Sequence, residues 1–190
     1  MTLVLASASP RRRELLHVLT TEFECIPSDI DETPMLGELP EDYVVRMAVE
    51  KAQAQIAADR LILAADTTVT IDGAIFGKPS DKHEAKVMLQ RLSGRQHLVH
   101  SAVAVRHGGV VQHCLVSTRV TFGCLTERLI AQYLATSEPW DKAGAYAIQG
   151  FAGCFVNRLE GSYTGVVGLP LLETRVLLES FGSEINWSQR

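Results

Sequence analysis

Apolar and polar positions in the N-terminal third of the chain predict a short strand followed by two helices. Residues 2–6 are an apolar run typical of a strand, and residues 10–18 follow as a helix. Ser9 is a favourable N-cap, and Pro10 suits the first helical position because its missing N–H would be unpaired there. Residues 40–57 predict a second helix, since their apolar side chains recur at helical spacing.

The segment that joins these helices predicts an irregular loop, called here the acidic loop (residues 23–39). It holds two prolines, one glycine and five acidic residues, a composition that breaks regular structure. An acidic loop near a basic helix start can form one wall of a metal site, whereas the simpler interpretation is a solvated charged loop.

The rest of the chain predicts further strands, hairpins and helices. Residues 61–65 are a continuous apolar run typical of a buried strand that ends at Asp66. Some predicted strands follow one another directly and others are separated by helices, which favours a mixed α/β sheet. The remaining predicted elements are a hairpin of 69–71 and 74–76, strands 99–105 and 110–121, a helix capped by Ser80 or Asp81 and ending near 92, helices 126–136 and 169–181, and a glycine-rich, strand-like segment 142–168.

Composition limits the class of protein. With 190 residues, 46% of them hydrophobic, the chain can bury a large core, and we expect one unit over residues 1–190. The net charge of -4 argues against a broad surface for a nucleic acid polymer. Four scattered cysteines indicate reduced thiols. No apolar stretch has the roughly 18 residues of a membrane span, and no signal-peptide pattern opens the chain, so we expect no membrane contact and a cytoplasmic location.

Three consecutive arginines, Arg11, Arg12 and Arg13, lie where the first helix begins. The helix dipole already places partial positive charge there, so further cations indicate that something anionic binds. A strand, a small-residue loop and a helix start together form a phosphate-binding arrangement. Because helical residues turn by about 100° each, one or two of these arginines can face a ligand and the third points to water. The alternative is a solvated basic cluster.

Asp66 is the sharpest single candidate for chemistry. It follows an apolar strand at the edge where open α/β sheets bind ligands, and a carboxylate there can bind a divalent cation or orient a water molecule. The alternative is an aspartate that bonds to its own backbone in a turn. Asp29, Asp31 and Glu32 in the acidic loop offer further oxygen ligands, and the sequence does not distinguish which of them points inward.

Lys51, Lys78 and Gln149 are candidates on three other segments. Lys51 lies beside the apolar face of its helix, where it either reaches a ligand or extends its stem to water. Lys78 is held between Gly77 and Pro79, which suits a fixed charge aimed at a phosphate. The amide of Gln149 can donate and accept, so it can recognise the edge of a base, and it can equally be an ordinary loop residue.

The common motifs for covalent serine chemistry and for nucleotide binding are missing. The chain has no Gly-x-Ser-x-Gly elbow, no Walker-type loop and no GxGxxG after a strand. What remains is several cations, a few carboxylates, serines at a helix start and a polar amide. This combination suits a metal-bridged polyphosphate, because the metal neutralises part of the charge and the basic groups neutralise the rest.

Seven stretches, in order along nearly the whole chain, match one protein family. They are Leu5-Ala6-Ser7-Ala8-Ser9-Pro10-Arg11-Arg12, Glu50-Lys51-Ala52, Ala65-Asp66-Thr67, Gly77-Lys78-Pro79, Leu92-Ser93-Gly94, Lys142-Ala143-Gly144-Ala145-Tyr146-Ala147-Ile148-Gln149-Gly150 and Gly168-Leu169-Pro170. On these stretches the chain resembles the Maf-type nucleoside triphosphate pyrophosphatases. The resemblance implies an ITPase-like (Maf/Ham) α/β fold, with a mixed sheet, flanking helices and two lobes around a central cleft, usually in a homodimer. It also implies hydrolysis of a nucleoside triphosphate to the monophosphate and pyrophosphate with Mg²⁺ or Mn²⁺.

The resemblance also implies a substrate and a role for each matching residue. The run Ala147-Ile148-Gln149-Gly150 resembles the branch that acts on dTTP and UTP rather than the branch that acts on 7-methyl-GTP. Within the acidic loop, which varies in length in this family, Asp29 or Asp31 could take the place of Glu32. By position, the catalytic acid of the family is matched by Asp66. The positions associated with base choice are matched by Arg12, Thr67 and Gln149, and the phosphate-side positions by Ser7, Arg11, Lys51 and Lys78. The metal-side positions are matched by Glu32 and Asp66.

Two other functions are compatible with the same residues. A regulatory protein of cell division would bind the nucleotide as a signal, and a house-cleaning hydrolase would act on modified pyrimidine nucleotides. Release of pyrophosphate separates the regulator from an enzyme. A kinetic comparison of canonical with modified pyrimidine triphosphates ranks the two enzymes.

Overall fold

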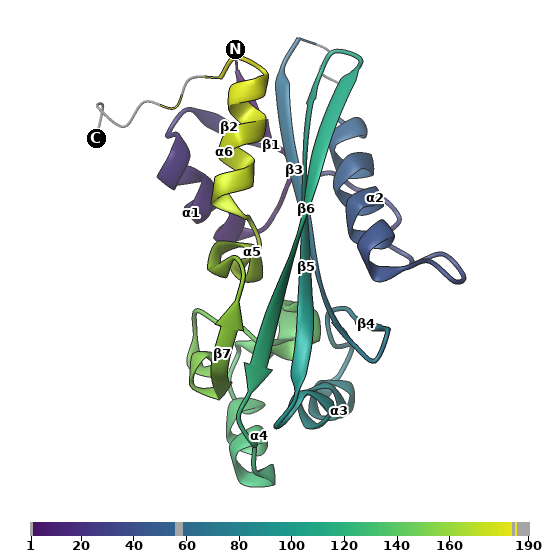
Figure 1. Ribbon diagram of the computed structural model, residues 1–190, viewed down its shortest axis with the longest axis vertical. Coiled ribbons are helices and arrows are strands. Elements are labelled where there is room, and N and C mark those ends of the chain that lie inside the picture. Colours follow the sequence, from purple (N-terminus) through teal and green to yellow (C-terminus); the bar gives the residue numbers. More distant parts are fainter. Residues whose placement is uncertain (1, 56–58, 184, 186–190) are drawn as a thin grey trace.

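The structure is a computed structural model that describes residues 2–55, 59–183 and 185. Within them the chain forms a seven-stranded sheet in the order β2-β1-β3-β5-β6-β7, with β4 paired to β3 (Figure 1). The expected mixed α/β sheet is therefore confirmed. The strands are β1 (Leu3–Leu5), β2 (Phe23–Cys25), β3 (Leu61–Ile71), β4 (Ala74–Phe76), β5 (Gln96–His107), β6 (Val110–Phe122) and β7 (Val156–Glu160).

Parallel and antiparallel pairing meet at β3. Strand β1 runs parallel to β2 and to β3. Parallel neighbours require long crossover connections, and α1 (Pro10–Leu19) and α2 (Pro40–Gln53) lie in these connections. From β3 onward, β5, β6 and β7 pair antiparallel, and only residues 108–109 separate β5 from β6. The long strands β3, β5 and β6 run through the length of the molecule and twist as they do so (Figure 1).

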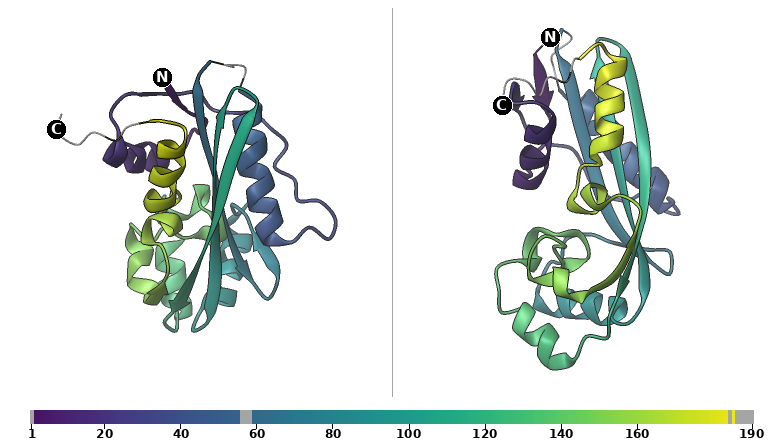
Figure 2. Two further views of the ribbon diagram at one scale, coloured as in Figure 1. Left: turned by 45° about the horizontal axis from the view of Figure 1, so that its top comes forward. Right: turned by 60° about the vertical axis from the view of Figure 1, so that its left-hand side comes forward.

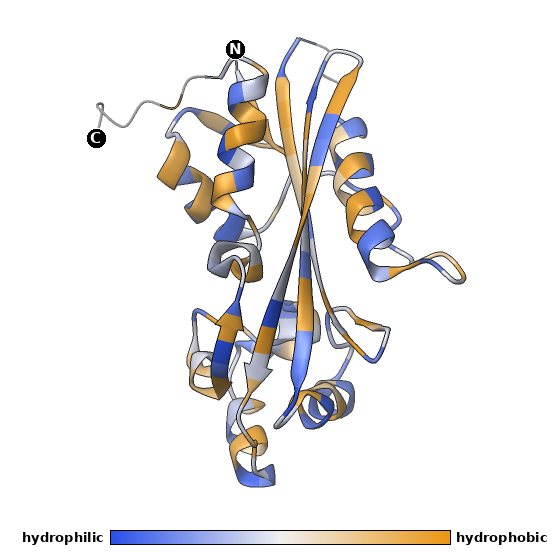
Figure 3. Ribbon diagram, viewed as in Figure 1, coloured by the Kyte–Doolittle hydropathy of each residue, from blue (hydrophilic) through white to orange (hydrophobic). Residues whose placement is uncertain are grey.

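Helices cover both faces of the sheet around β1 (Figure 2). Helix α2 packs on one face, against a buried cluster that includes Ile62 and Ala64. Helices α1 and α6 (Leu171–Ser180) pack on the other face, against a cluster that includes Leu61, Leu63 and Ala65. The continuous apolar run of β3 is explained by burial on both faces, and Figure 3 shows the first part of this strand as hydrophobic.

A third buried cluster fills the opposite end of the molecule, where α3 (Lys82–Leu92) and α4 (Glu127–Tyr133) pack near β7 (Figure 2). Its centre is Phe122, which makes edge contacts with His97, Tyr146 and Phe155. The 3-10 helices Pro139–Asp141, Ala143–Ala145 and Phe151–Phe155 and helix α5 (Tyr163–Val167) complete the described elements. No described helix is both long and apolar enough to cross a membrane.

The apolar strand does not end at Asp66, contrary to the sequence-based expectation. Strand β3 continues to Ile71, because residues 62–70 keep pairing with β5. The residues after Asp66 are threonine, valine and isoleucine, whose β-branched side chains favour an extended strand. Asp66 therefore lies in the middle of a long strand rather than at its carboxyl end.

The segment 142–168 is a second correction, since its only strand is β7. The glycine-rich run forms 3-10 turns instead, and Gly144 adopts a φ of 70° that breaks any alternating pattern. Ser162 begins α5 by accepting a hydrogen bond from the Gly165 amide. The acidic loop contains the short strand β2, and the last helix begins at Leu171. The predicted helix 40–57 ends at Gln53, and its residues 56–57 lie outside the described residues.

Candidate active site

A gap along one edge of β3 creates the site. Strand β1 pairs with β3 as far as Leu63, and β4 pairs with β3 from Val69 onward. Among the described strands, none pairs with this edge of β3 over residues 64–68. Successive side chains of a strand point to opposite faces, so Asp66 projects toward α2 and Thr67 toward α1. One exposed edge thus offers a carboxylate and a hydroxyl to two different helices.

A cavity of about 680 Å³ lies at this gap. It is bounded by the loop after β1, the acidic loop, α2, the loop after β4 and the segment that carries Gln149. Nine residues that the sequence or the family resemblance assigned to the site contribute to its lining. These residues are Ser7, Arg11, Arg12, Glu32, Lys51, Asp66, Thr67, Lys78 and Gln149.

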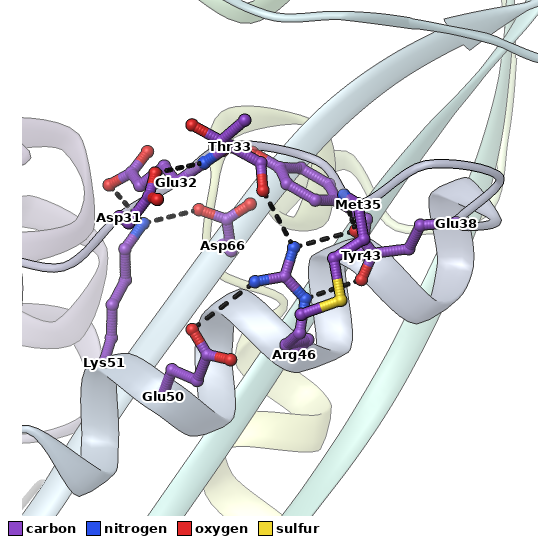
Figure 4. Close-up of polar contacts among 10 residues, drawn as sticks. All are labelled: Asp31, Glu32, Thr33, Met35, Glu38, Tyr43, Arg46, Glu50, Lys51 and Asp66. Carbon is purple, nitrogen blue, oxygen red and sulfur yellow. Dashed lines mark hydrogen bonds and ion pairs between the residues drawn. The ribbon is translucent and has the colours of Figure 1, made fainter.

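Two carboxylates meet at one buried ammonium on the α2 wall (Figure 4). Lys51 Nζ lies 2.7 Å from Asp66 Oδ1 and 2.8 Å from Glu32 Oε1. Lys51 and Asp66 are each only 7% exposed, so the lysine does not extend its stem to water. The shared positive charge lets two carboxylates lie together that would otherwise repel each other. Burial would raise the pKa of Glu32, but the hydrogen bond and charge of Lys51 outweigh it and leave that pKa below its ordinary value.

Helix α2 also fixes the backbone of the acidic loop around Glu32 (Figure 4). The Tyr43 hydroxyl donates to the Glu32 carbonyl at 3.0 Å, and Arg46 Nη2 donates to the Thr33 carbonyl at 3.1 Å. Arg46 also donates to both carboxylate oxygens of Glu38, at 2.6 and 2.7 Å. These hydrogen bonds lower the pKa of Glu38 to about 2. The loop is therefore tied to the helix on both sides of Thr33, which holds Glu32 in front of Lys51.

Arg12 connects three segments on the α1 wall. Its Nε donates to the Gly168 carbonyl at 2.9 Å, while its two terminal nitrogens donate to Ser7 Oγ at 3.4 Å and to Thr67 Oγ1 at 3.3 Å. Thr67 Oγ1 also lies 3.0 Å from Ser101 Oγ. Burial lowers the pKa of Arg12, and the nearby Asp66 charge opposes that shift. The guanidinium is thus held in one position at the cavity wall.

The three consecutive arginines have different surroundings. Arg11 and Arg12 line the cavity, and Arg11 forms an ion pair of 3.3 Å with Asp141. Arg13 is exposed and does not line the cavity. Two of the three arginines therefore line the cavity and the third does not, and their contact with a ligand stays a prediction.

Lys78 and Gln149 reach the cavity from two loops that touch each other. The Gly144 amide donates to the Gly77 carbonyl at 3.0 Å, which ties the loop of Lys78 to the segment leading to Gln149. Both side chains are exposed and line the cavity. Neither side chain takes part in an ion pair that the structure describes, so both can contact a ligand directly.

Glu32 and Asp66 are the described residues best placed to hold a metal ion. No group of three or more histidine, cysteine, aspartate or glutamate side chains converges anywhere in the described ranges. Magnesium commonly takes one or two protein carboxylates and completes its shell with water and substrate phosphates. A pair of carboxylates beside a wall of basic side chains fits that donor set. Asp29 and Asp31 do not line the cavity, so Glu32 is the acid of the loop that points inward.

Sequence reasoning missed several residues of the cavity wall. Tyr43, Asp141 and Lys142 line it, and Asp141 pairs with both Lys142 and Arg11. Tyr43 lies two helical turns before Lys51 on the same face of α2, a spacing that could have revealed it. Lys142 opens the longest of the matched stretches, but its charge alone does not distinguish a wall residue from a solvated one.

Comparisons with known proteins show which family and which fold this chain resembles. Residues 2–181 match the family described as Maf-like protein. A dTTP/UTP pyrophosphatase of Methylobacillus flagellatus is 51% identical, with 97% of this chain and 95% of that protein covered. A dTTP/UTP pyrophosphatase of Shewanella oneidensis is 50% identical, with 96% and 99% covered. The Ham1 protein of Staphylococcus aureus, a solved structure, has a TM-score of 0.51 at 12% identity and covers 95% of this chain and 97% of that one, a likeness of fold alone.

Proposed function

The chain belongs to the Maf-like protein family, and from this premise we propose that it is an enzyme that hydrolyses dTTP and UTP to the nucleoside monophosphate and pyrophosphate. The relatives at about 50% identity that bear the name dTTP/UTP pyrophosphatase support this substrate. The observation that carries the proposal is the cavity, in which cations from four segments face a pair of carboxylates. Its volume of about 680 Å³ is that of a site for a small ligand such as a nucleotide.

In this proposal the phosphate chain lies along the cationic wall. Ser7 offers a hydroxyl beside the start of α1, where backbone amides and the helix dipole favour an anion. Arg11 and Lys78 approach from two sides of the cavity, and Lys51 approaches from α2. In a site partly closed to water, each of these charges stabilises the developing negative charge more strongly than it would in bulk solvent.

Glu32 and Asp66 are the residues that would hold a divalent cation, Mg²⁺ or Mn²⁺, together with phosphate oxygens. Such an ion, when bound, neutralises phosphate charge and lowers the pKa of a coordinated water molecule. The chain's own contribution is to hold the two carboxylates side by side. Lys51 does this by hydrogen bonding to one oxygen of each.

Asp66 is the residue to which we assign the attacking water. Its Oδ1 accepts from Lys51, so Oδ2 is the oxygen that accepts a hydrogen bond from a water aimed at the α-phosphorus. A carboxylate in this position orients the water and takes up its proton as the bond to phosphorus forms. Pyrophosphate is then the leaving group, and Arg11 and Lys78 stabilise its charge.

Gln149, with Arg12 and Thr67, is assigned to the choice of base. The amide oxygen accepts from N3–H of uracil or thymine and the amide nitrogen donates to a ring carbonyl, whereas cytosine presents the reverse pattern. An amide can rotate by half a turn, so discrimination requires that its orientation be held. The fixed guanidinium of Arg12 and its partner Thr67 supply a rigid wall beside the base.

A nucleotide panel with identification of both products tests the proposal. Canonical and modified pyrimidine triphosphates, CTP and the purine triphosphates are each incubated with the protein and either Mg²⁺ or Mn²⁺. The expected result is release of pyrophosphate and monophosphate, fastest from dTTP, UTP or a modified relative of them. Orthophosphate release would contradict attack at the α-phosphorus. Nucleotide binding without any product would favour the regulatory protein of cell division, and faster turnover of modified pyrimidines would favour the house-cleaning hydrolase.

Two further parts of the proposal concern the state of the protein rather than its chemistry. We propose that it forms a homodimer and works in the cytoplasm, both of which derive from the family resemblance and the composition. Light scattering on the purified chain tests the first, and cell fractionation tests the second.

A further inference from the structure

We propose that Glu138, which does not line the cavity, is a positioning residue that holds Gln149 in the orientation needed to select the base. The inference rests on the proposed function and adds a residue to its specificity machinery. Glu138 lies just after α4 and immediately before the 3-10 helix Pro139–Asp141. Its carboxylate reaches the Gln149 loop, defined here as residues 147–152.

The Glu138 carboxylate accepts three hydrogen bonds. Oε2 accepts from the Phe151 amide at 2.8 Å. Oε1 accepts from the Tyr133 hydroxyl at 2.9 Å and from the Ala152 amide at 3.2 Å. These amides open a 3-10 helix and have no carbonyl of their own helix to bond to, so the carboxylate satisfies groups that would otherwise be unpaired.

The Tyr133 hydroxyl extends this support to the other side of Gln149. It accepts from the Ala147 amide at 3.3 Å while it donates to Glu138. Ala147 and Phe151 each lie two residues from Gln149, one before it and one after it. A single side-chain network therefore fixes the loop on both sides of the residue that reads the base, and leaves Gln149 itself exposed to the cavity.

The close fit of the loop over the carboxylate is a second, independent observation. A Cβ added at Gly150 would lie 1.9 Å from Glu138 Oε2, closer than any real contact. The backbone next to Gln149 thus rests directly on the carboxylate, and only glycine allows this approach. Burial, and then the nearby Glu138, raise the pKa of Tyr133, so its hydroxyl keeps the proton that it donates.

The position of this network predicts an effect on base choice rather than on the chemical step. Glu138 belongs to the end of the molecule built around α4, whereas Asp66, Lys51 and Glu32 are held by α2. A shift of the Gln149 loop would misplace the amide that distinguishes uracil from cytosine. A tenfold change in the ratio of specificities corresponds to about 1.4 kcal/mol, which the loss of one or two hydrogen bonds can supply.

Glu138→Gln is the decisive variant, because it keeps the shape but replaces one acceptor oxygen with an NH₂ group. At least one of the three donors then loses its acceptor. We expect the ratio of kcat/KM for UTP to that for CTP to fall about tenfold, with kcat for UTP changed by less than about threefold. Hydrogen exchange of the Phe151 and Ala147 amides should become faster, a readout that does not depend on activity.

Glu127→Gln is the matched control, since Glu127 is an exposed carboxylate in α4 that pairs with Lys86 and Gln90. It should change neither the UTP to CTP ratio nor the exchange of the loop. An unchanged ratio in folded Glu138→Gln would overturn the inference, and so would an equal change in both variants.

Tyr133→Phe keeps the test decisive if Glu138→Gln does not fold. It removes the contact to Ala147 and leaves the carboxylate with its two amides, so we expect a smaller fall of the ratio in the same direction. No change in that variant would overturn the inference. Failure of the proposed function is distinguishable, because the unmodified protein would then release no pyrophosphate from any pyrimidine triphosphate.

Discussion

The two loops that frame the cavity are held in different ways. The acidic loop is held mainly by charge, through Arg46, which binds both the Glu38 carboxylate and the Thr33 carbonyl. The Gln149 loop is held by a carboxylate and a hydroxyl that accept from backbone amides. The first arrangement keeps an acidic side chain in place among other charges, and the second fixes the path of the backbone beside an amide.

This difference matches the two tasks that we propose for the loops. Holding a metal and a triphosphate requires charges that are balanced before the substrate arrives, and the pairs of Lys51 with Glu32 and Asp66 balance them. Recognising a base requires an amide that is held in one orientation, and a fixed backbone helps to hold it. If the two loops are specialised in this way, variants that loosen the acidic loop should alter turnover and metal dependence. Variants that loosen the Gln149 loop should alter base choice.

Asp66→Asn should give the largest effect, a loss of turnover of roughly 10²–10⁴-fold with every base, because it removes the carboxylate that orients the water. Folding should persist, since asparagine keeps the shape and Thr67 and Ala65 keep their places in β3. Steady-state kinetics and thermal unfolding measure the two. Asp72→Asn, in the exposed turn after β3, is the control and should leave kcat unchanged. Near-normal turnover in Asp66→Asn would exclude Asp66 from the chemistry.

Arg46→Met should rank second. Without the guanidinium, the Thr33 carbonyl loses its donor and Glu38 keeps only the Met35 amide, so Glu32 is held less firmly in front of Lys51. Outer-shell changes of this kind typically cost about 10- to 100-fold in metal affinity or activity. We expect the Mg²⁺ concentration for half-maximal rate to rise by a factor in that range, with the UTP to CTP ratio unaltered.

The control for Arg46→Met is Arg175→Met, which removes a guanidinium from an exposed pair with Glu179 on α6. That variant should show the metal dependence of the unmodified protein. A changed UTP to CTP ratio of kcat/KM in Arg46→Met, without a changed metal dependence, would mean that the two loops are not separate in function.

Gln149→Glu should act on base choice and give a smaller effect. The carboxylate cannot donate to a ring carbonyl of uracil, so the kcat/KM ratio of UTP to CTP should fall about tenfold, equivalent to roughly 1.4 kcal/mol. The Mg²⁺ dependence should not change. Gln132→Glu, at an exposed position on α4, is the matched control for added charge. A constant ratio in Gln149→Glu would show that another residue reads the base.

Part of this site could be predicted from the sequence because its first motif lies where a strand ends and a helix begins. Ser9 and Pro10 begin α1 as expected, with the Ser9 side chain accepting from the Arg12 amide. The nine candidate residues all line one cavity, and their roles stay predictions.

What the sequence did not reveal depends on contacts between distant segments. Asp66 lies in the middle of β3 because pairing with β5 continues past it, and that pairing joins residues far apart in the chain. The segment 142–168 carried no periodic pattern from which its 3-10 turns could be inferred, since its conformation is set by contacts such as that of Gly144 with Gly77. Glu138 likewise contacts the backbone amides of Phe151 and Ala152, which lie more than ten residues away, and no sequence motif marks this contact.

The smallest expected effect is on the pH dependence of the free energy of unfolding, and it tests whether charge holds the acidic loop. Hydrogen bonds from Arg46 lower the pKa of Glu38 from 4.5 to about 2 in the folded protein. A folded pKa below the unfolded one means that the ionised carboxylate favours folding above about pH 4.5 and that this contribution is lost as the pH falls toward 2. The free energy of unfolding of the unmodified protein should therefore exceed that of Glu38→Gln most at neutral pH, and the gap should narrow below pH 4.5. Urea unfolding at a series of pH values measures this gap, and a gap that widens on acidification would show that the Arg46 pair does not hold the acidic loop by charge.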